Sequence, residues 1–294
     1  MQRRILTRKL LSMALASSLT LVGGMGLVYA QTTAVQGPTR AASGDTSLLK
    51  IPLVQTPQVP HPWVAVMPRL AAEAYFANLV DGDKIEMPFL VKFGLSGGWG
   101  LAPIATPVSG KSGRHHLLVN RDLPLDFKQA LPFSDQYIHF GKGQMETVLN
   151  LAPGIYKLRM LLADDKHLPH FVYSKPLSIT VIKTNAIDSK SLVKRGISLG
   201  VAETGLSRPF RVQFHASGLN VAHQVQREKD TGYFRLMILP GAGGKSAELD
   251  FVNGQTEVWL EPPAGEYTLK LDLIDSANPG KVLASAEPRT VKFK

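Results

Sequence analysis

The chain has 294 residues, with 33 Lys or Arg against 23 Asp or Glu, and it contains no cysteine. A sequence without thiols excludes disulfide scaffolds, thiolate zinc fingers, iron–sulfur clusters, cysteine nucleophiles and a lipidated N-terminal cysteine. A hydrophobic content of 44% together with 26 Gly and 20 Pro is typical of a folded protein that is rich in turns.

The first 30 residues have the pattern of a signal peptide. A basic start is followed by an apolar or small run over residues 10–29, which ends in small residues at Val28 and Ala30. We therefore expect residues 1–30 to be cleaved and the mature chain to be periplasmic or secreted. An uncleaved membrane anchor is the alternative, but several Ser and Gly residues dilute the apolar run. The Arg3-Arg4 pair leaves open whether export follows the general or the twin-arginine route.

Removal of residues 1–30 lowers the formal net charge from +10 to +6. No basic run with interleaved aromatic residues is present, so nucleic acid is not an expected partner. We expect contact with a membrane only during export. An unknown envelope or periplasmic protein is the partner that an exported chain of this kind would meet.

Residues 31–64 are predicted to form a flexible linker. This stretch is rich in Thr, Gln, Gly and Ser and ends in closely spaced prolines, which deny both helix and sheet hydrogen bonds (Pro52, Pro57, Pro60 and Pro62).

Residues 65–184 are predicted to form a first β-sandwich domain. A strand at residues 74–77 followed by the turn Asp81-Gly82-Asp83 is favoured over a helix at residues 67–78. Short β-branched or alternating runs then recur between Gly and Pro turn signals, at residues 86–95, 115–120, 136–140, 146–151, 155–162 and 177–182. So many strands without intervening helices are typical of an immunoglobulin-like sandwich.

A second, degenerate copy of this domain is predicted at residues 195–294. Residues 140–164 align without a gap with residues 251–275, and ten of the 25 aligned pairs are identical. The shared Tyr156 and Tyr267 follow a Gly turn, and we interpret them as core or corner residues. The fold class is therefore all-β, with two immunoglobulin-like sandwiches in tandem after the signal peptide and the proline-rich linker.

Several motifs of the first domain occur in a fixed order. They are Phe93-Gly94-Leu95-Ser96-Gly97, Trp99-Gly100-Leu101-Ala102-Pro103, His115-His116-Leu117-Leu118-Val119, His139-Phe140-Gly141-Lys142-Gly143-Gln144 and His167-Leu168-Pro169-His170. Over about residues 72–182 the chain resembles a bacterial family that carries the domain of unknown function numbered 4399. The resemblance implies a small, exported, β-rich domain and no known activity. Arg114 replaces a histidine that the family often has before the pair. In the second copy, Tyr233-Phe234-Arg235 replaces the pair itself.

The histidines of the first domain are candidate metal ligands, because imidazole is the commonest ligand for zinc and copper in proteins. Adjacent strand residues point to opposite faces. His115 shares the face of Leu117 and Val119, which indicates the core, and His116 points the other way. His139 likewise points away from the face of its two apolar neighbours.

His167 and His170 flank Pro169 in a predicted loop and can converge through the geometry of a turn. The sequence therefore predicts one zinc or copper site with four ligands: His116, His139, His167 and His170. Asp164 or Asp165 is a further ligand or a hydrogen-bonding partner of one, and His115 is a secondary candidate. In the structural alternative, these histidines only hold turns through hydrogen bonds to backbone carbonyls.

The loop at residues 97–113 contains Trp99 among several Gly and Pro residues. An exposed Trp in such a loop could dock a partner, whereas a buried one would anchor the loop. We predict a non-enzymatic exported binding protein whose first domain binds a transition metal, with no cofactor certain. The alternative is a structural or interaction component of the cell envelope without a metal.

Overall fold

The structure is a computed structural model that describes residues 61–65, 73–102, 111–124, 126–201, 209–241 and 243–293. These residues belong to one compact unit, Pro57–Lys294. The predicted signal peptide and all but residues 61–64 of the predicted linker lie outside the described residues. A search of the described part of the chain finds no helix with the length and apolar character needed to cross a membrane.

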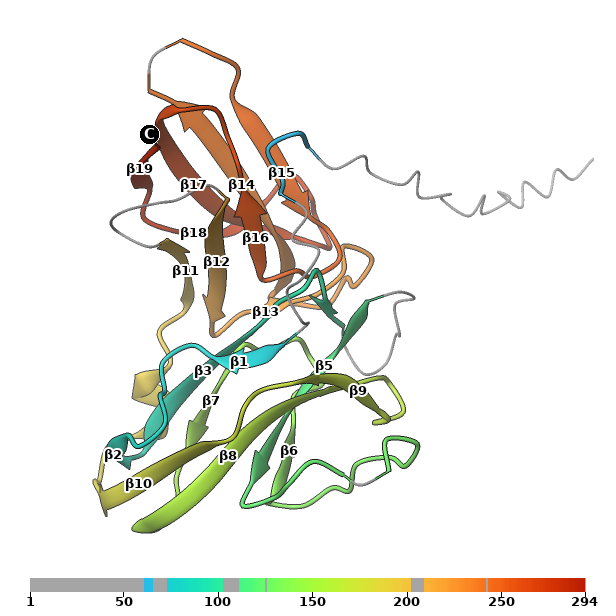
Figure 1. The fold of residues 1–294 in the computed structure, drawn as a ribbon, viewed down its shortest axis with the longest axis vertical. Coiled ribbons are helices and arrows are strands. Elements are labelled where there is room, and N and C mark those ends of the chain that lie inside the picture. The colour runs from blue at the N-terminus through green and yellow to red at the C-terminus, as the bar shows by residue number, and fades with distance from the viewer. Residues whose placement is uncertain are drawn as a thin grey trace, which may run out of the picture. The chain divides into compact units, whose positions relative to one another are not determined.

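The first half is a sandwich of two sheets (Figure 1). The smaller sheet has the order β1 (Ala74–Phe76), β3 (Phe89–Leu95) and β7 (Glu146–Leu149). The larger sheet has the order β2 (Lys84–Met87), β10 (Leu177–Thr184), β8 (Gly154–Ala163), β5 (Ser112–Val119) and β4 (Gly100–Leu101). Two short strands extend the larger sheet: β6 (Tyr137–His139) pairs with β5, and β9 (Pro169–Tyr173) pairs with β8.

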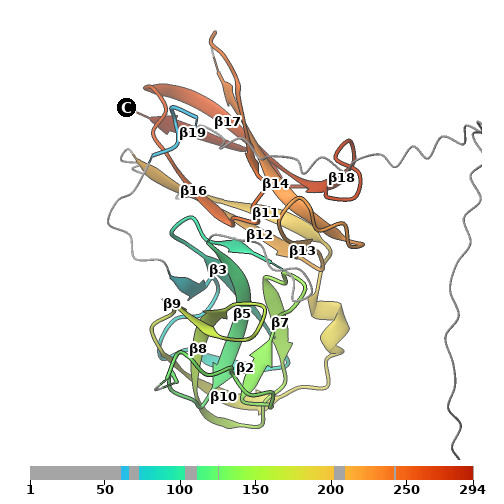
Figure 2. The ribbon, with the colours of Figure 1, turned by 90° about the vertical axis from the view of Figure 1, so that its right-hand side faces the viewer.

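The second half repeats this architecture (Figure 2). A short 3₁₀ helix, η1 (Ser189–Leu192), connects the halves. The smaller sheet has the order β11 (Gly196–Val201), β12 (Phe210–Ser217) and β16 (Glu257–Leu260). The larger sheet has the order β13 (Asn220–Val221), β14 (Thr231–Pro240), β17 (Gly265–Asp275) and β18 (Val282–Ser285), with β15 (Ala247–Phe251) on β14 and β19 (Arg289–Phe293) on β17. The prediction of two immunoglobulin-like sandwiches is confirmed.

Strand pairing follows the same plan in both halves, as an internal duplication requires. The order β1-β3-β7 corresponds to β11-β12-β16, and the short parallel pair β4·β5 corresponds to β13·β14. The two shared tyrosines also make the same hydrogen bond, from the hydroxyl to a carbonyl four residues earlier in the chain. The hydroxyl of Tyr156 donates to the carbonyl of Ala152, and that of Tyr267 donates to the carbonyl of Pro263. These are tyrosine corners, as the corner interpretation of the sequence predicted.

Alternation of apolar side chains builds each core. Along β12, Phe210, Val212, Phe214 and Ala216 are buried while the residues between them are half-buried.

The expectation of one strand over residues 86–95 was wrong. The run is divided at Pro88 into β2 and β3, which belong to different sheets. Proline has no backbone N–H, so it cannot continue a ladder, and the chain changes sheets there.

The two halves contact each other through equivalent residues. The N–H of Val221 donates to the carbonyl of Gly143 (2.9 Å), and the N–H of Leu101 donates to the carbonyl of Gly254 (2.9 Å). Gly143 and Gly254 are aligned positions of the repeat, and Leu101 and Val221 end the corresponding strands β4 and β13. The contact therefore uses the same pair of surfaces on each copy, once in each direction.

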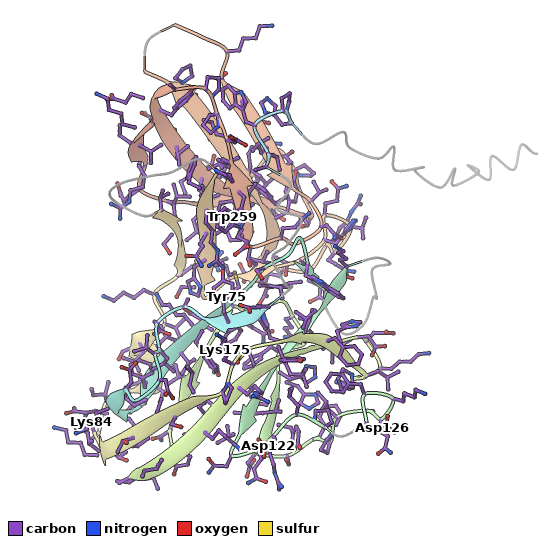
Figure 3. The ribbon with its side chains drawn as sticks, viewed as in Figure 1. Tyr75, Lys84, Asp122, Asp126, Lys175 and Trp259 are labelled. Atoms are coloured by element: carbon purple, nitrogen blue, oxygen red, sulfur yellow. The ribbon has the colours of Figure 1, made fainter. Side chains whose placement is uncertain are left out.

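The segment between β5 and β6 covers the outer face of the larger sheet in the first half. Leu118 and Leu161 of that face form a small second core with Leu131 of the segment and with Ala163. Asp122 and Asp126, labelled in Figure 3, lie on this covering segment. Residues on the outer face of β5 are thus buried, although they point away from the main core.

Candidate metal centre

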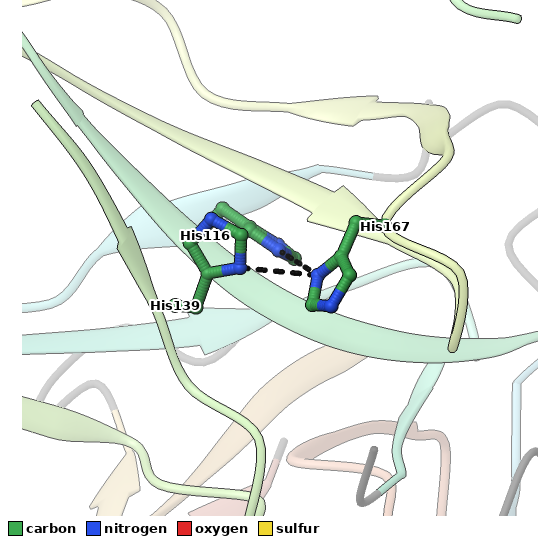
Figure 4. A group of neighbouring side chains, drawn as sticks. All are labelled: His116, His139 and His167. Carbon is green, nitrogen blue, oxygen red and sulfur yellow. Dashed lines mark hydrogen bonds between the residues drawn. The ribbon is translucent and has the colours of Figure 1, made fainter. Parts of the chain in front are cut away.

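Three imidazole rings meet beside this second core (Figure 4). His116 of β5 and His139 of β6 are direct partners in the strand register, so their side chains lie on the same face. His167 approaches from the turn between β8 and β9. One ring nitrogen of each residue lies within 4.8 Å of those of the other two.

In His116 and His139, one ring nitrogen faces His167 and the other faces a backbone carbonyl. His116 Nε2 and His139 Nδ1 lie 3.3 Å and 3.0 Å from His167 Nδ1. The other nitrogen of His116, Nδ1, lies 3.2 Å from the carbonyl oxygen of Arg114. The other nitrogen of His139, Nε2, lies 2.9 Å from the carbonyl oxygen of Pro132.

A carbonyl oxygen can only accept a hydrogen bond, so the nitrogen that faces it must carry the proton. His116 is therefore protonated on Nδ1 and His139 on Nε2. A neutral imidazole has one protonated nitrogen, which leaves His116 Nε2 and His139 Nδ1 with lone pairs directed at His167. The two carbonyls thus present unprotonated nitrogens to a common point, as outer partners of metal-bound histidines do.

Burial keeps the rings neutral. His116 is fully buried, and its pKa falls from 6.5 to about 2 because burial and the neighbouring His139 disfavour its charged form. Burial also lowers the pKa of His139 and of His167, and the positive charge of Arg114 lowers both further. Neutral imidazole is the form that binds a metal, so the trio is competent to bind at neutral pH.

The turn that carries His167 is held in place by its backbone. Oδ1 of Asp164 accepts hydrogen bonds from the N–H groups of Lys166 and Leu168, both at 2.8 Å. The carbonyl of His167 accepts from the N–H of Leu131 (2.9 Å). His167 has a φ of +62°, a left-handed conformation that costs a non-glycine residue energy and often marks a functional position. Asp164 therefore positions His167 through the turn.

The two nitrogen–nitrogen separations that involve His167 fit a tetrahedral ion. Zinc–nitrogen bonds of 2.0–2.1 Å at a tetrahedral angle place two nitrogens about 3.3 Å apart. The two separations from His167 Nδ1 are 3.0 Å and 3.3 Å. An all-imidazole donor set suits zinc and copper.

The structure brings together three of the four predicted ligands, and His170 and the secondary candidate His115 lie elsewhere. His170 belongs to strand β9 and not to a loop, and its ring packs against Trp99 with centroids 4.8 Å apart. His115 faces the main core and contacts Phe93 at a centroid distance of 4.9 Å. The strand period sends both side chains away from the cluster.

Trp99 is half-buried and packs against the main core. Partner binding through this residue stays a prediction, and residues 103–110 of its loop lie outside the described residues.

Sequence reasoning missed three parts of the cluster: the carbonyls of Arg114 and Pro132, and the ring of Phe133. Phe133 is 72% exposed, stacks on His139 with centroids 4.1 Å apart and lies edge-on to His167 at 4.7 Å. A single Phe among the other apolar residues of this segment gives no sequence signal for such a position. Backbone carbonyls give none at all.

A carboxylate and a histidine do meet where the two halves contact, as a hydrolytic site would need. Glu146 accepts hydrogen bonds from His215 Nε2 (3.0 Å), from the hydroxyl of Ser217 (2.6 Å) and from the N–H of Gly218 (3.2 Å). Burial raises the pKa of Glu146, but these hydrogen bonds outweigh it and hold the pKa below its usual value. The hydroxyl of Ser217 bonds to the carboxylate and not to the imidazole, so the nucleophile–base pair of a catalytic triad is not formed.

We expect the metal-free protein to lose stability as the pH falls from 7 to 5. Burial, opposed by the carbonyls of Gly94 and Gln144, lowers the pKa of His115 to about 4. The unfolded chain protonates this residue near pH 6.5, so unfolding takes up a proton between these values. The stabilisation from the neutral imidazole is complete above pH 6.5 and is lost towards pH 4. At pH 5 the free energy of unfolding should be lower by on the order of 2 kcal/mol. Urea unfolding with a chelator present measures this loss.

The variant His115→Gln cannot titrate and isolates this contribution. Its free energy of unfolding should fall less steeply with decreasing pH than that of the unsubstituted protein. Equal slopes would show that His115 is protonated in the folded state as easily as in the unfolded chain.

Comparison with known proteins gives a family and a set of distant structural likenesses. No curated protein matches the sequence. The fibronectin(III)-like modules of Clostridium thermocellum CbhA are 11% identical, with a TM-score of 0.23 over 74% of this chain and 92% of that chain. The FN1–FN3 domains of chicken CNTN1 are 11% identical, with a TM-score of 0.21 over 74% and 63%. A two-domain fibronectin type-III segment of chicken tenascin is 13% identical, with a TM-score of 0.18 over 76% and 97%.

One family model matches the sequence twice, at residues 91–182 and at residues 212–291. The first match contains the three clustered histidines, and the second covers the half in which other residues replace the histidine pair. Together the matches span more than half of the chain, which therefore belongs to the family described as Domain of unknown function (DUF4399) and carries two copies of its domain.

Proposed function

We propose that the first sandwich binds one divalent transition-metal ion, zinc or copper, through His116, His139 and His167. The observation that supports this most is the pair of carbonyls that leave two ring nitrogens unprotonated and directed at His167. Without a cation, His167 Nδ1 can carry only one proton, and the two lone pairs would have to share it. A bound ion would satisfy all three nitrogens at once.

We further propose that the protein is an exported binding protein and not an enzyme. The basic and apolar pattern of residues 1–30 supports export to the periplasm or beyond. The second sandwich, without a histidine pair, would serve as a spacer or as a docking module for an envelope protein.

The alternative is a structural envelope component whose histidines only hold loops. The hydrogen bond from His139 to Pro132 favours it, because it ties the covering segment to β6, and the bond from His116 to Arg114 holds the imidazole against its own strand. This alternative explains the outer ring nitrogens but not the convergence of the inner ones.

Titration with Co(II) tests the proposal, since four-coordinate Co(II) reports its geometry through visible absorption. The protein is purified without a polyhistidine tag, stripped with chelator and titrated with Co(II), and Zn(II) is then used to displace the Co(II). We expect one equivalent to bind with a four-coordinate spectrum. The variant His139→Gln should weaken binding at least about 100-fold, because loss of a ligand costs more than loss of an outer hydrogen bond.

His170→Gln is the matched control. It removes an imidazole from the same domain, but this imidazole packs against Trp99 and lies outside the cluster. Binding should be unchanged in this variant. Equal losses in His139→Gln and His170→Gln, or no binding of Co(II), Zn(II) or Cu(II) to the unsubstituted protein, would overturn the proposal.

A further inference from the structure

Three imidazoles leave one position of a four-coordinate ion open, and among the described residues no further His, Cys, Asp or Glu side chain joins the group. The ring of His170 packs against Trp99. Oδ1 of Asp164 already accepts two backbone hydrogen bonds within its turn. Three protein ligands with a fourth position for water or an outside ligand is the arrangement of reactive metal sites, whereas closed sites use four protein ligands.

The charges around the site favour an anion as the fourth ligand. Three neutral imidazoles leave the ion's two positive charges unbalanced. Arg114 precedes His116 by two residues in β5, so its buried side chain brings a positive charge to the same face of the strand. Asp164 and Asp165 oppose part of that charge from the turn. An anion at the fourth position would balance the remainder.

An apolar ring lies beside two of the three imidazoles. Phe133 stacks on His139 and lies edge-on to His167, and 72% of its surface is exposed. His139 and His167 are themselves only half-buried, so these two rings are accessible to solvent. A flat or apolar group attached to the anion would bury this ring, which otherwise faces water.

We propose that the fourth coordination position takes a small carboxylate from solution, whose oxygen binds the ion and whose apolar part lies against Phe133. This proposal rests on the metal site proposed above. The chemical class is a carboxylate with an aromatic or other apolar substituent, which would displace the water that otherwise fills the position. No covalent bond of the ligand is made or broken.

Anion titration of the Co(II)-loaded protein tests this. Acetate and benzoate carry the same carboxylate and differ in the apolar part. We expect both to change the Co(II) absorption spectrum to saturation, with benzoate binding about three- to tenfold more tightly, the gain typical of one aromatic contact. The variant Phe133→Ala should remove this preference, so that acetate and benzoate bind the Co(II)-loaded variant with equal affinity.

Phe171→Ala is the matched control, because Phe171 is similarly exposed (77%) but its ring stacks on Phe127 and not on a histidine of the cluster. It should keep the preference for benzoate. A four-coordinate Co(II) spectrum that no anion changes would overturn this inference and leave the metal site standing. A preference for benzoate that survives Phe133→Ala would overturn the role of Phe133. Failure to bind Co(II) at all would remove both proposals.

Discussion

Replacing Gly143 with alanine is expected to destabilise the protein by about 2–5 kcal/mol. A Cβ at this position would overlap the carbonyl oxygen of Val221 and lie 2.9 Å from its carbonyl carbon, so backbone must move. Overpacking of this kind costs about 1–3 kcal/mol or more, and the left-handed φ of +83° adds about 1–2 kcal/mol. Denaturant unfolding gives the total. Hydrogen exchange at the N–H of Val221, which donates to Gly143, locates the damage.

Gly82→Ala separates the close contact from the backbone strain. Gly82 has nearly the same φ, +87°, but nothing lies within 4 Å of the added carbon, so only about 1–2 kcal/mol should be lost. The second copy offers the same comparison. Gly254 and Gly98 share a φ of +74°, and only Gly254 lies against the other half, 2.5 Å from the oxygen of Leu101. Equal losses within either pair would mean that the halves separate without cost.

Metal binding is expected to stabilise the folded protein by about 2.7 kcal/mol when the free ion is at 100 times its dissociation constant. The folded state places the three imidazoles together, whereas the unfolded chain separates them, so the ion binds the folded state preferentially. For a protein of this size the melting temperature should rise by roughly 5–10 °C. Differential scanning calorimetry with and without Zn(II) measures the shift.

His167→Asn removes the ligand and preserves the turn, because asparagine tolerates a left-handed φ better than other non-glycine residues. The metal-free variant should be as stable as the metal-free parent, and its melting temperature should not respond to Zn(II). A response of normal size would place the ion elsewhere. A large loss of stability in the metal-free variant would assign His167 a structural role instead.

Local patterns in the sequence predicted most of the fold. The segment from β7 to β8 recurs as β16 to β17 because a Gly turn and alternating apolar residues specify each copy by itself. The two strands do not pair as a hairpin, since in each copy they belong to different sheets. The break at Pro88 could have been expected from the same rules, since proline cannot pair within a ladder. The contact between the halves could not, because no local pattern states which surfaces of two similar domains meet.

The candidate site was predicted as far as strand alternation reaches. Alternation of strand side chains correctly placed His116 and His115 on opposite faces and turned His139 away from the core. It gave no help at residues 167–173, where an expected loop is in fact a turn followed by β9, and that register takes His170 to Trp99. Phe133 and the carbonyl of Pro132 depend on how the covering segment packs, which only the folded chain shows.

The paired contacts of Gly143 with Val221 and of Gly254 with Leu101 limit how many such domains one chain can join. Domains that meet head to tail leave a free surface at each end, so their arrays can grow by further duplication. An isologous contact consumes the same surface on both members and closes the assembly at two. Under the proposals above, each closed pair would carry one ion, and its second member would contribute stability and surface without a site of its own.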